Sequence, residues 1–362
     1  MKTGCGAAVL LAAMLFGIAS AQEAALPLKE QNELLVQDIK RVHELTEKQA
    51  AEVRTIFSRS RFIGQGNPAV TRHPLSTKQC LGSLNKSSIE YANPEFERVC
   101  GAKYMSPLYD PATETMDEAD ACIDQFEFPN IPCSYPVVWV RASEAAAFCE
   151  ATGKRLCDAH EWEGACAGAL LEPDYRFDLA KDVAPGDAVS RMRRVHNAAQ
   201  EGNQLWSYGR EYRTGVCAAA SAKSPSCDGG GWAACGSNTY PAGSFPECRS
   251  ELGVYDLHGN AAEHMNLPLD ESQMASRGSR KLGHTEMKGS WFIFDRYKAH
   301  EDYCRWRAPY WHGGRVMAPD SHHNYHLGFR CCKTVEPARE AGDRPQGGLL
   351  QPAIPTACHD HQ

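Results

Sequence analysis

The chain has 362 residues, 45 acidic against 38 basic side chains and a formal net charge of −7. This acidic balance excludes the usual nucleic-acid-binding protein, because holding a phosphate backbone requires a concentrated positive surface. Sixteen cysteines are typical of an oxidising compartment, where disulfides persist.

Residues 1–21 have the pattern of a secretory signal peptide. Lys2 precedes an apolar run over residues 7–18, and a small-residue stretch then ends at Ala21, after which we expect cleavage. The apolar run is too short for a membrane span, and no other stretch is long enough for one. The sequence therefore predicts an exported protein, periplasmic or secreted, without a membrane span.

Residues 22–60 are predicted to form an amphipathic helix. Apolar residues recur at helical spacing between positions 28 and 57, with charged residues between them. Such a stripe can dock on the main domain, pair with another chain or act as a spacer. We expect docking rather than self-association through residues 28–57, because fewer than about four clean heptads are present.

Residues 61–118 are rich in Gly, Pro, Asn and Ser, which predicts a loop-rich N-terminal segment. We call this segment the collar, and we expect disulfides of Cys80 and Cys100 to hold it in place. A domain over residues 119–335 follows. The tail, residues 336–362, contains Gly and Pro and is expected to be poorly ordered.

Inside this domain, the β-branched run Pro136–Val140 predicts a strand. A helix is expected to start at Ser143 and to stop before Gly153. Asp158 can cap the next helix, because Glu161 occupies the capping-box position three residues later.

Five short motifs follow one another in a fixed order over the last two-thirds of the chain. They are Tyr135-Pro-Val-Val-Trp-Val140, Gly153-Lys-Arg-Leu-Cys157 running into Glu161-Trp-Glu163, Gly253-Val-Tyr-Asp-Leu-His-Gly-Asn260 closing on Glu263, Gly289-Ser-Trp291, and Leu327-Gly-Phe-Arg330. In order and spacing they resemble the formylglycine-generating-enzyme (sulfatase-modifying factor) domain. This resemblance implies an α+β, C-type-lectin-like fold that is loop-rich and holds several disulfides.

The resemblance fails at the family's catalytic cysteines. Those enzymes hold copper through two thiolates, which suit the softer copper ion, and oxidise a substrate cysteine with oxygen. The matching positions here are Ile293 and either Lys298 or Ala299, so the chain resembles a divergent member without the copper-binding pair. Cys304 matches a further cysteine of the motif and is expected to be structural.

In the family, the copper ion lies in a cleft, and the other residues expected to line that cleft here are aromatic and basic. Such a lining suits a planar or anionic ligand, but it is equally typical of core packing. The cleft candidates are Ser290, Trp291, Arg305 and Arg307. A transition metal, iron or copper, is a further expectation, for a histidine-rich stretch; the alternative for such a tract is a solvated surface. Its candidate ligands are His322, His323 and His326.

Structural calcium is implied by the resemblance, through carbonyl and carboxylate oxygens. The first site would use His258, Gly259, Ala261 and Glu263, and a weaker second site would use Asn197, Ala198 and Asp228. The alternative for Glu263 is a buried salt bridge.

Removing Cys5 with the signal peptide leaves fifteen cysteines, of which one must stay unpaired within the chain. Proximity in the sequence suggests the bridges Cys157–Cys166 and Cys122–Cys133.

The function predicted from these observations is an exported, metal-dependent oxidoreductase that is not a copper–cysteine formylglycine generator. The alternative is a non-catalytic module that binds a peptide, a glycan, a small molecule or a partner protein.

Overall fold

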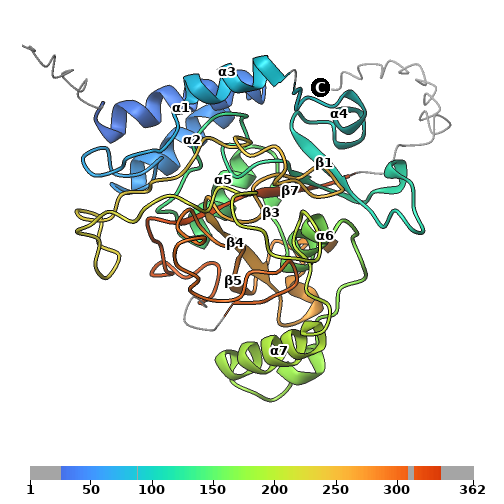
Figure 1. The fold of residues 1–362 in the computed structure, drawn as a ribbon. Coiled ribbons are helices and arrows are strands. Elements are labelled where there is room, and N and C mark those ends of the chain that lie inside the picture. Colours follow the sequence, from blue (N-terminus) through green and yellow to red (C-terminus); the bar gives the residue numbers. More distant parts are fainter. Residues whose placement is uncertain (1–25, 88, 309–313, 336–362) are drawn as a thin grey trace, which may run out of the picture.

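The computed structural model describes residues 26–87, 89–308 and 314–335. The predicted signal peptide and the predicted tail lie outside these residues. Figure 1 shows α1 and α3 at one end of the molecule and α7 at the other, with two small sheets and long irregular loops between them. Within the described ranges, no helix is long and apolar enough to cross a membrane.

The N-terminal segment forms two helices, α1 (Leu28–Val42) and α2 (Glu47–Arg59), instead of the single predicted helix. The break has a local cause, because Thr46 caps α2 in a capping box with Gln49 and Glu44 adopts a positive φ of 54°. The apolar stripes of both helices lie in one core with Phe148 of the main domain. The predicted docking is therefore confirmed.

The collar contains more regular structure than its composition predicts. It forms α3 (Thr77–Ser87) and α4 (Pro94–Cys100). Asn93 caps α4, Pro94 occupies its first turn and Gly101 ends it in the left-handed conformation, so the loop-forming residues act here as helix boundaries.

A four-stranded antiparallel sheet has the order β1-β2-β7-β3. Its strands are β1 (Met105–Leu108), β2 (Ala121–Asp124), β7 (Cys331–Thr334) and β3 (Arg155–Leu156). The last strand in the described residues, β7, thus lies inside the sheet, which joins the end of the domain to its beginning.

A second sheet has the order β5-β4-β6, with β4 antiparallel to β5 and parallel to β6. Its strands are β4 (Ala262–Leu267), β5 (His284–Lys288) and β6 (Leu327–Phe329). The predicted strand over residues 136–140 is wrong: Val138 makes a single bridge to Gly64, and the left-handed backbone of Trp139, φ 61°, prevents further pairing.

Among the described residues the domain also contains the helices α5 (Ala142–Ala151), α6 (Ala159–Ala167) and α7 (Pro185–Gln200). Four short 3₁₀ helices are η1 (Met116–Glu118), η2 (Phe177–Ala180), η3 (Glu271–Gln273) and η4 (Ala275–Arg277). The predicted capping box of Asp158 and Glu161 is confirmed at the start of α6, and Gly153 follows the end of α5 with φ 76°.

Seven disulfides pair every cysteine in the described part of the chain. They are Cys80–Cys133, Cys100–Cys122, Cys149–Cys331, Cys157–Cys332, Cys166–Cys304, Cys217–Cys248 and Cys227–Cys235. The bridges Cys157–Cys166 and Cys122–Cys133 predicted from sequence proximity are wrong. Pairing follows the sheet instead: Arg155 and Leu156 of β3 lie opposite Cys332 and Cys331 of β7, which brings Cys157 to Cys332. Both collar cysteines are bonded to cysteines of the domain, Cys80 to Cys133 and Cys100 to Cys122.

Candidate functional site

Ser290 lies two residues after the end of β5, in a turn that Gly289 makes possible. Gly289 has φ 72°, and a Cβ there would lie 2.7 Å from a backbone oxygen. The Ser290 hydroxyl accepts the Gly259 N–H at 2.9 Å and donates to Asp302 at 3.0 Å. Because it is 1% exposed and directs its proton to a carboxylate, Ser290 holds two loops together rather than presenting a nucleophile.

Behind Ser290, the imidazole of His258 lies against the Cys166–Cys304 bridge. Its Nε2 is 3.3 Å from the Cys166 sulfur and accepts the Ser207 N–H at 3.1 Å. The bond between the two sulfurs leaves no thiolate for a metal, and it is consistent with the expected structural role of Cys304.

Trp291 is stacked on His326, with ring centroids 4.3 Å apart, and His300 is stacked on Trp306 at 4.7 Å. Trp291 and His326 are only 6% and 5% exposed. Trp291, one of the cleft candidates, is therefore buried in a ring contact with His326 rather than exposed in a cleft.

His326 is the unusual member of this cluster, because neither ring nitrogen has a hydrogen-bond partner among the described residues. Burial, together with the neighbouring His322, His300 and His264, lowers its pKa to about 3. His326 is therefore neutral at physiological pH, with one nitrogen able to donate and the other able to accept.

The three candidate ligands of a transition metal do not converge. His323 lies near the rings of Phe62 and Trp139 and 3.3 Å from Arg141, whereas His326 lies on Trp291. His322 is exposed. Over the described ranges, none of the groups of three ligand atoms within 4.8 Å of one another includes these histidines. The three side chains as they stand do not fit one iron or copper ion.

Glu263, the carboxylate expected to bind calcium, is buried in an ion pair. Arg330 donates to its two oxygens at 2.6 and 2.7 Å, and the Trp162 indole donates at 2.9 Å. The guanidinium already neutralises this carboxylate, so the first donor set does not fit calcium without displacing Arg330. The alternative stated for Glu263, a buried salt bridge, is the arrangement that the structure shows.

The residues of the second calcium prediction are also engaged elsewhere. Asn197 bonds to the backbone of Arg307 through both its amide nitrogen and its oxygen. Ala198 lies within α7, and Asp228 is exposed beside the Cys227–Cys235 bridge. Guanidinium groups around Asn197 make its surroundings unfavourable for a cation.

Arg307, another cleft candidate, is fully buried in an ion network. It donates to Glu163 at 2.9 and 3.2 Å and to Asp174 at 2.9 Å, while Lys288 donates to the same Glu163 carboxylate at 3.0 Å. Arg305 is half-buried, and its carbonyl oxygen is bound by His196. The Arg307 guanidinium is therefore held in the buried ion network rather than exposed in a cleft.

The positions that match the family's copper cysteines contain no thiol. Ile293 is 4% exposed and packs in an apolar cluster, and Lys298 forms an exposed ion pair with Glu301. Since all fourteen cysteines in the described residues are paired, a two-thiolate copper site cannot form among them in the oxidised protein.

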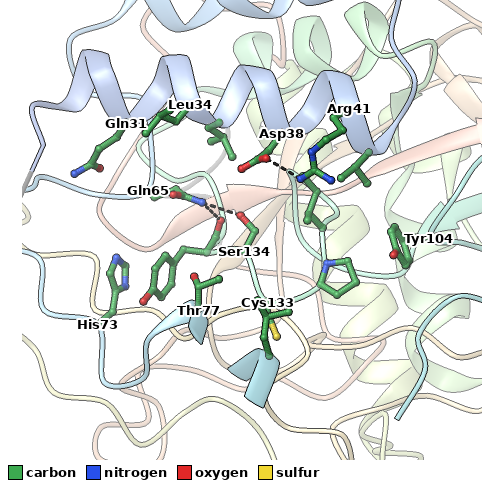
Figure 2. A pocket seen from close by; sticks show the side chains of 16 residues that line it. Gln31, Leu34, Asp38, Arg41, Gln65, His73, Thr77, Tyr104, Cys133 and Ser134 are labelled. Atoms are coloured by element: carbon green, nitrogen blue, oxygen red, sulfur yellow. Dashed lines mark hydrogen bonds and ion pairs between the residues drawn. The ribbon is translucent and has the colours of Figure 1, made fainter. Parts of the chain in front are cut away.

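A cavity of about 670 Å³ opens elsewhere, between α1, α3 and the loop over residues 131–135. Figure 2 shows Gln31, Leu34, Asp38 and Arg41 extending from α1 towards it, with His73, Thr77 and Ser134 on the other side. Leu34 is 57% exposed and Leu81 is 46% exposed, so leucines on two helices border the same opening.

Polar groups are held in fixed positions around this cavity. The Gln65 amide donates to the Ser134 hydroxyl at 3.0 Å and to the Tyr135 carbonyl at 2.6 Å. His73 stacks on Tyr135, and its Nδ1 donates to the Thr239 carbonyl. Burial lowers the pKa of His73 to about 4, so the ring is neutral. A cavity of this size, with apolar side chains beside polar groups in fixed positions, can hold a ligand.

Sequence reasoning missed this cavity, because its lining comes from segments that are far apart in the chain. Leu34 falls outside the docking stripe of α1, but a single exposed leucine is common on protein surfaces and does not by itself indicate a site.

The model of the sulfatase-modifying factor enzyme 1-like domain matches residues 81–335. The comparison with curated proteins found no match. Among solved structures, the chain is similar to the one titled "Crystal Structure of CarF", at 14% identity, over 56% of this chain and 69% of that chain, with a TM-score of 0.27. A likeness that low supports no conclusion about function.

Proposed function

Because the chain belongs to the family of sulfatase-modifying factor enzyme 1-like domains, we propose that it is an exported binding module of that family, not a copper–thiolate oxidase. The observation that carries this proposal is the bonding of every described cysteine in a disulfide. Seven disulfides indicate an oxidising compartment, and the signal-peptide pattern of residues 1–21 supports export to it.

The ligand site is the cavity between α1 and α3. The side of the cavity formed by α1 lies outside the matched residues 81–335. A segment that precedes the matched domain therefore forms part of the site. Leu34, Leu81 and Pro132 offer apolar contacts, while the amides of Gln31 and Gln65 can bond to backbone groups. This combination suits an extended peptide with apolar side chains.

Selection from a displayed peptide library is expected to enrich peptides that bind the full chain through this cavity. Leu34→Glu combined with Leu81→Glu should weaken their binding at least ten-fold, because two carboxylates would enter the apolar walls. Leu171→Glu is the matched control, since Leu171 is 49% exposed outside the cavity. Peptides that bind the double variant and the control equally well would show that the cavity is not the site.

Metal-dependent oxidation is the second candidate function, and its one supporting observation is that neither ring nitrogen of His326 has a hydrogen-bond partner among the described residues. The donor geometry favours a metal-free chain, so elemental analysis is expected to find no stoichiometric calcium, iron or copper. Excess chelator should change the melting temperature by less than about 2 °C, because Arg330 already neutralises Glu263. A fall of several degrees in the melting temperature would instead support a structural calcium ion. Stoichiometric iron or copper that is lost in His326→Gln would favour the oxidoreductase.

A further inference from the structure

Two further cavities connect the last described residue, Val335, to the cavity between α1 and α3. The first, of about 540 Å³, lies where α4 meets β3 and β7, and Val335 is part of its lining. The second, of about 510 Å³, meets the cavity between α1 and α3 at Val42. The residues that the two have in common are Gly101, Gly153, Lys154 and Lys333. A surface track therefore runs from Val335 to the proposed ligand site, and Figure 1 shows α4 at the same end of the molecule as α1 and α3.

The track, which we define as the lining of these two connecting cavities, is mainly basic. The first cavity has no acidic side chain in its lining. Ion pairs offset part of the positive charge, such as those of Lys103 with Glu44 and of Arg155 with Glu161. Basic residues nevertheless outnumber acidic ones five to two in the lining: Arg98, Lys103, Lys154, Arg155 and Lys333 against Glu44 and Glu97. An acidic segment of chain fits such a surface better than a basic one.

The sequence of the tail changes character in the same order as the surface. Residues 336–343 contain three acidic side chains and one basic side chain. Residues 345–358 contain no charged side chain but three large aliphatic ones, Leu349, Leu350 and Ile354. An acidic stretch of the tail is thus followed by an apolar one, as the basic track is followed by the leucine-bordered cavity.

The lengths also agree. Residues 336–348 can span up to about 43 Å at ~3.3 Å each, whereas the radius of gyration of a domain of about 300 residues is only about 19 Å. The cavity lining extends along α1 from Val42 to Gln31, a rise of about 17 Å at ~1.5 Å per residue. Residues 349–354 cover about 17 Å in an extended chain. The tail is therefore long enough to reach the cavity, and its apolar part matches the cavity in length.

We propose that residues 345–358 occupy the cavity between α1 and α3 of their own chain, as an internal ligand that other peptides must displace. This inference rests on the proposed function, because it takes the cavity to be a peptide site. The aliphatic side chains of the segment pack on Leu34 and Leu81, and the acidic stretch follows the basic track. A tethered segment has an effective concentration of about 1 mM, so it weakens the apparent binding of a peptide with a Kd of about 100 μM about ten-fold.

The test compares the full chain with a full-length tail variant that carries Leu349→Asp, Leu350→Asp and Ile354→Asp. The probe is a fluorescein-labelled synthetic peptide with the sequence of residues 345–357, and fluorescence anisotropy measures its binding. The tail variant should bind the probe about ten-fold more tightly than the wild type, because its own tail no longer competes. The matched control adds three carboxylates beyond the segment and should stay within two-fold of the wild type; it carries His359→Asp, His361→Asp and Gln362→Asp.

Two substitutions in the cavity distinguish this inference from the proposed function. Leu34→Glu and Leu81→Glu, added to the tail variant, should abolish probe binding, which shows that the probe enters the cavity. Equal probe affinities of the wild type and the tail variant, with library-selected peptides still dependent on Leu34 and Leu81, would overturn the internal ligand alone. Failure of both chains to bind the probe or any selected peptide would overturn the proposed function as well.

A photo-crosslinker distinguishes the chain's own tail from that of a second copy. With p-benzoylphenylalanine in place of Leu34, which is 57% exposed beside the cavity, a crosslink to residues 345–358 should form within a single chain. Its yield should not depend on protein concentration. Crosslinks that form only between two chains, with a yield that rises with concentration, would overturn the internal arrangement.

Discussion

Replacing Glu163 by glutamine is expected to lower the free energy of unfolding by about 3–5 kcal/mol, the cost of breaking a buried ion pair by removing one partner. Its carboxylate is fully buried and accepts from both Arg307 and Lys288. Burial alone would raise the pKa of Glu163, but the charges of Arg307 and Lys288 hold it well below its usual range. Without that negative charge, two cations would remain in the interior against Asp174 alone.

Glu33→Gln is the matched control. Arg54 binds the Glu33 carboxylate with two hydrogen bonds of 2.8 Å, but both side chains are nearly half exposed. Water and salt screen such a pair, so the control should cost less than about 1 kcal/mol. Denaturant titration followed by circular dichroism, without reductant, measures both variants. Equal losses in the two would show that burial does not set the strength of the Glu163 network.

Features of the fold that depend on neighbouring residues were predicted well. The capping box of Asp158 and Glu161, the helix stop at Gly153 and the docking of the N-terminal apolar stripe need only local spacing, and the structure confirms them. The five ordered motifs likewise predicted the α+β fold of the family, which the match over residues 81–335 confirms. Short-range hydrogen bonding and motif order are properties that a single sequence carries.

Features that depend on distant partners were not predictable in the same way. Cys149 and Cys157 pair with Cys331 and Cys332 because β3 lies beside β7 in the sheet, a relation that no spacing reveals. The strand predicted over residues 136–140 does not form, because the backbone of Trp139 is left-handed.

The candidate site shows the same limit. The sequence identified Glu263 and Arg330 as separate motif residues, but only the folded chain shows that they neutralise each other. Conversely, the cavity between α1 and α3 is lined by residues from 31 to 135 that share no motif. A site formed by packing separate segments leaves no periodic or spaced pattern in the sequence, so it becomes visible only with the tertiary structure.

Acid is expected to destabilise the chain through His326, and His326→Gln should remove that sensitivity. The unfolded pKa is near 6.5, whereas burial and the neighbouring histidines lower the folded pKa to about 3. Between these values the unfolded chain binds the proton and the folded chain does not, so this contribution to stability is complete above pH 6.5 and is lost as the pH falls towards 3. At pH 5 the loss is about 2 kcal/mol, since each pKa unit corresponds to about 1.36 kcal/mol.

Other buried groups titrate over the same range, and Asp256 acts in the opposite direction because burial raises its pKa to about 7. The measurement is therefore the difference in unfolding free energy between wild type and His326→Gln, at pH 7.5 and at pH 5, in which the contributions of unchanged groups cancel. The difference should move by about 2 kcal/mol in favour of the variant at pH 5. His322→Gln, at an exposed position, should show a smaller change. An unchanged difference for His326→Gln would mean that the ring is already protonated, or has a bonding partner, in the folded chain.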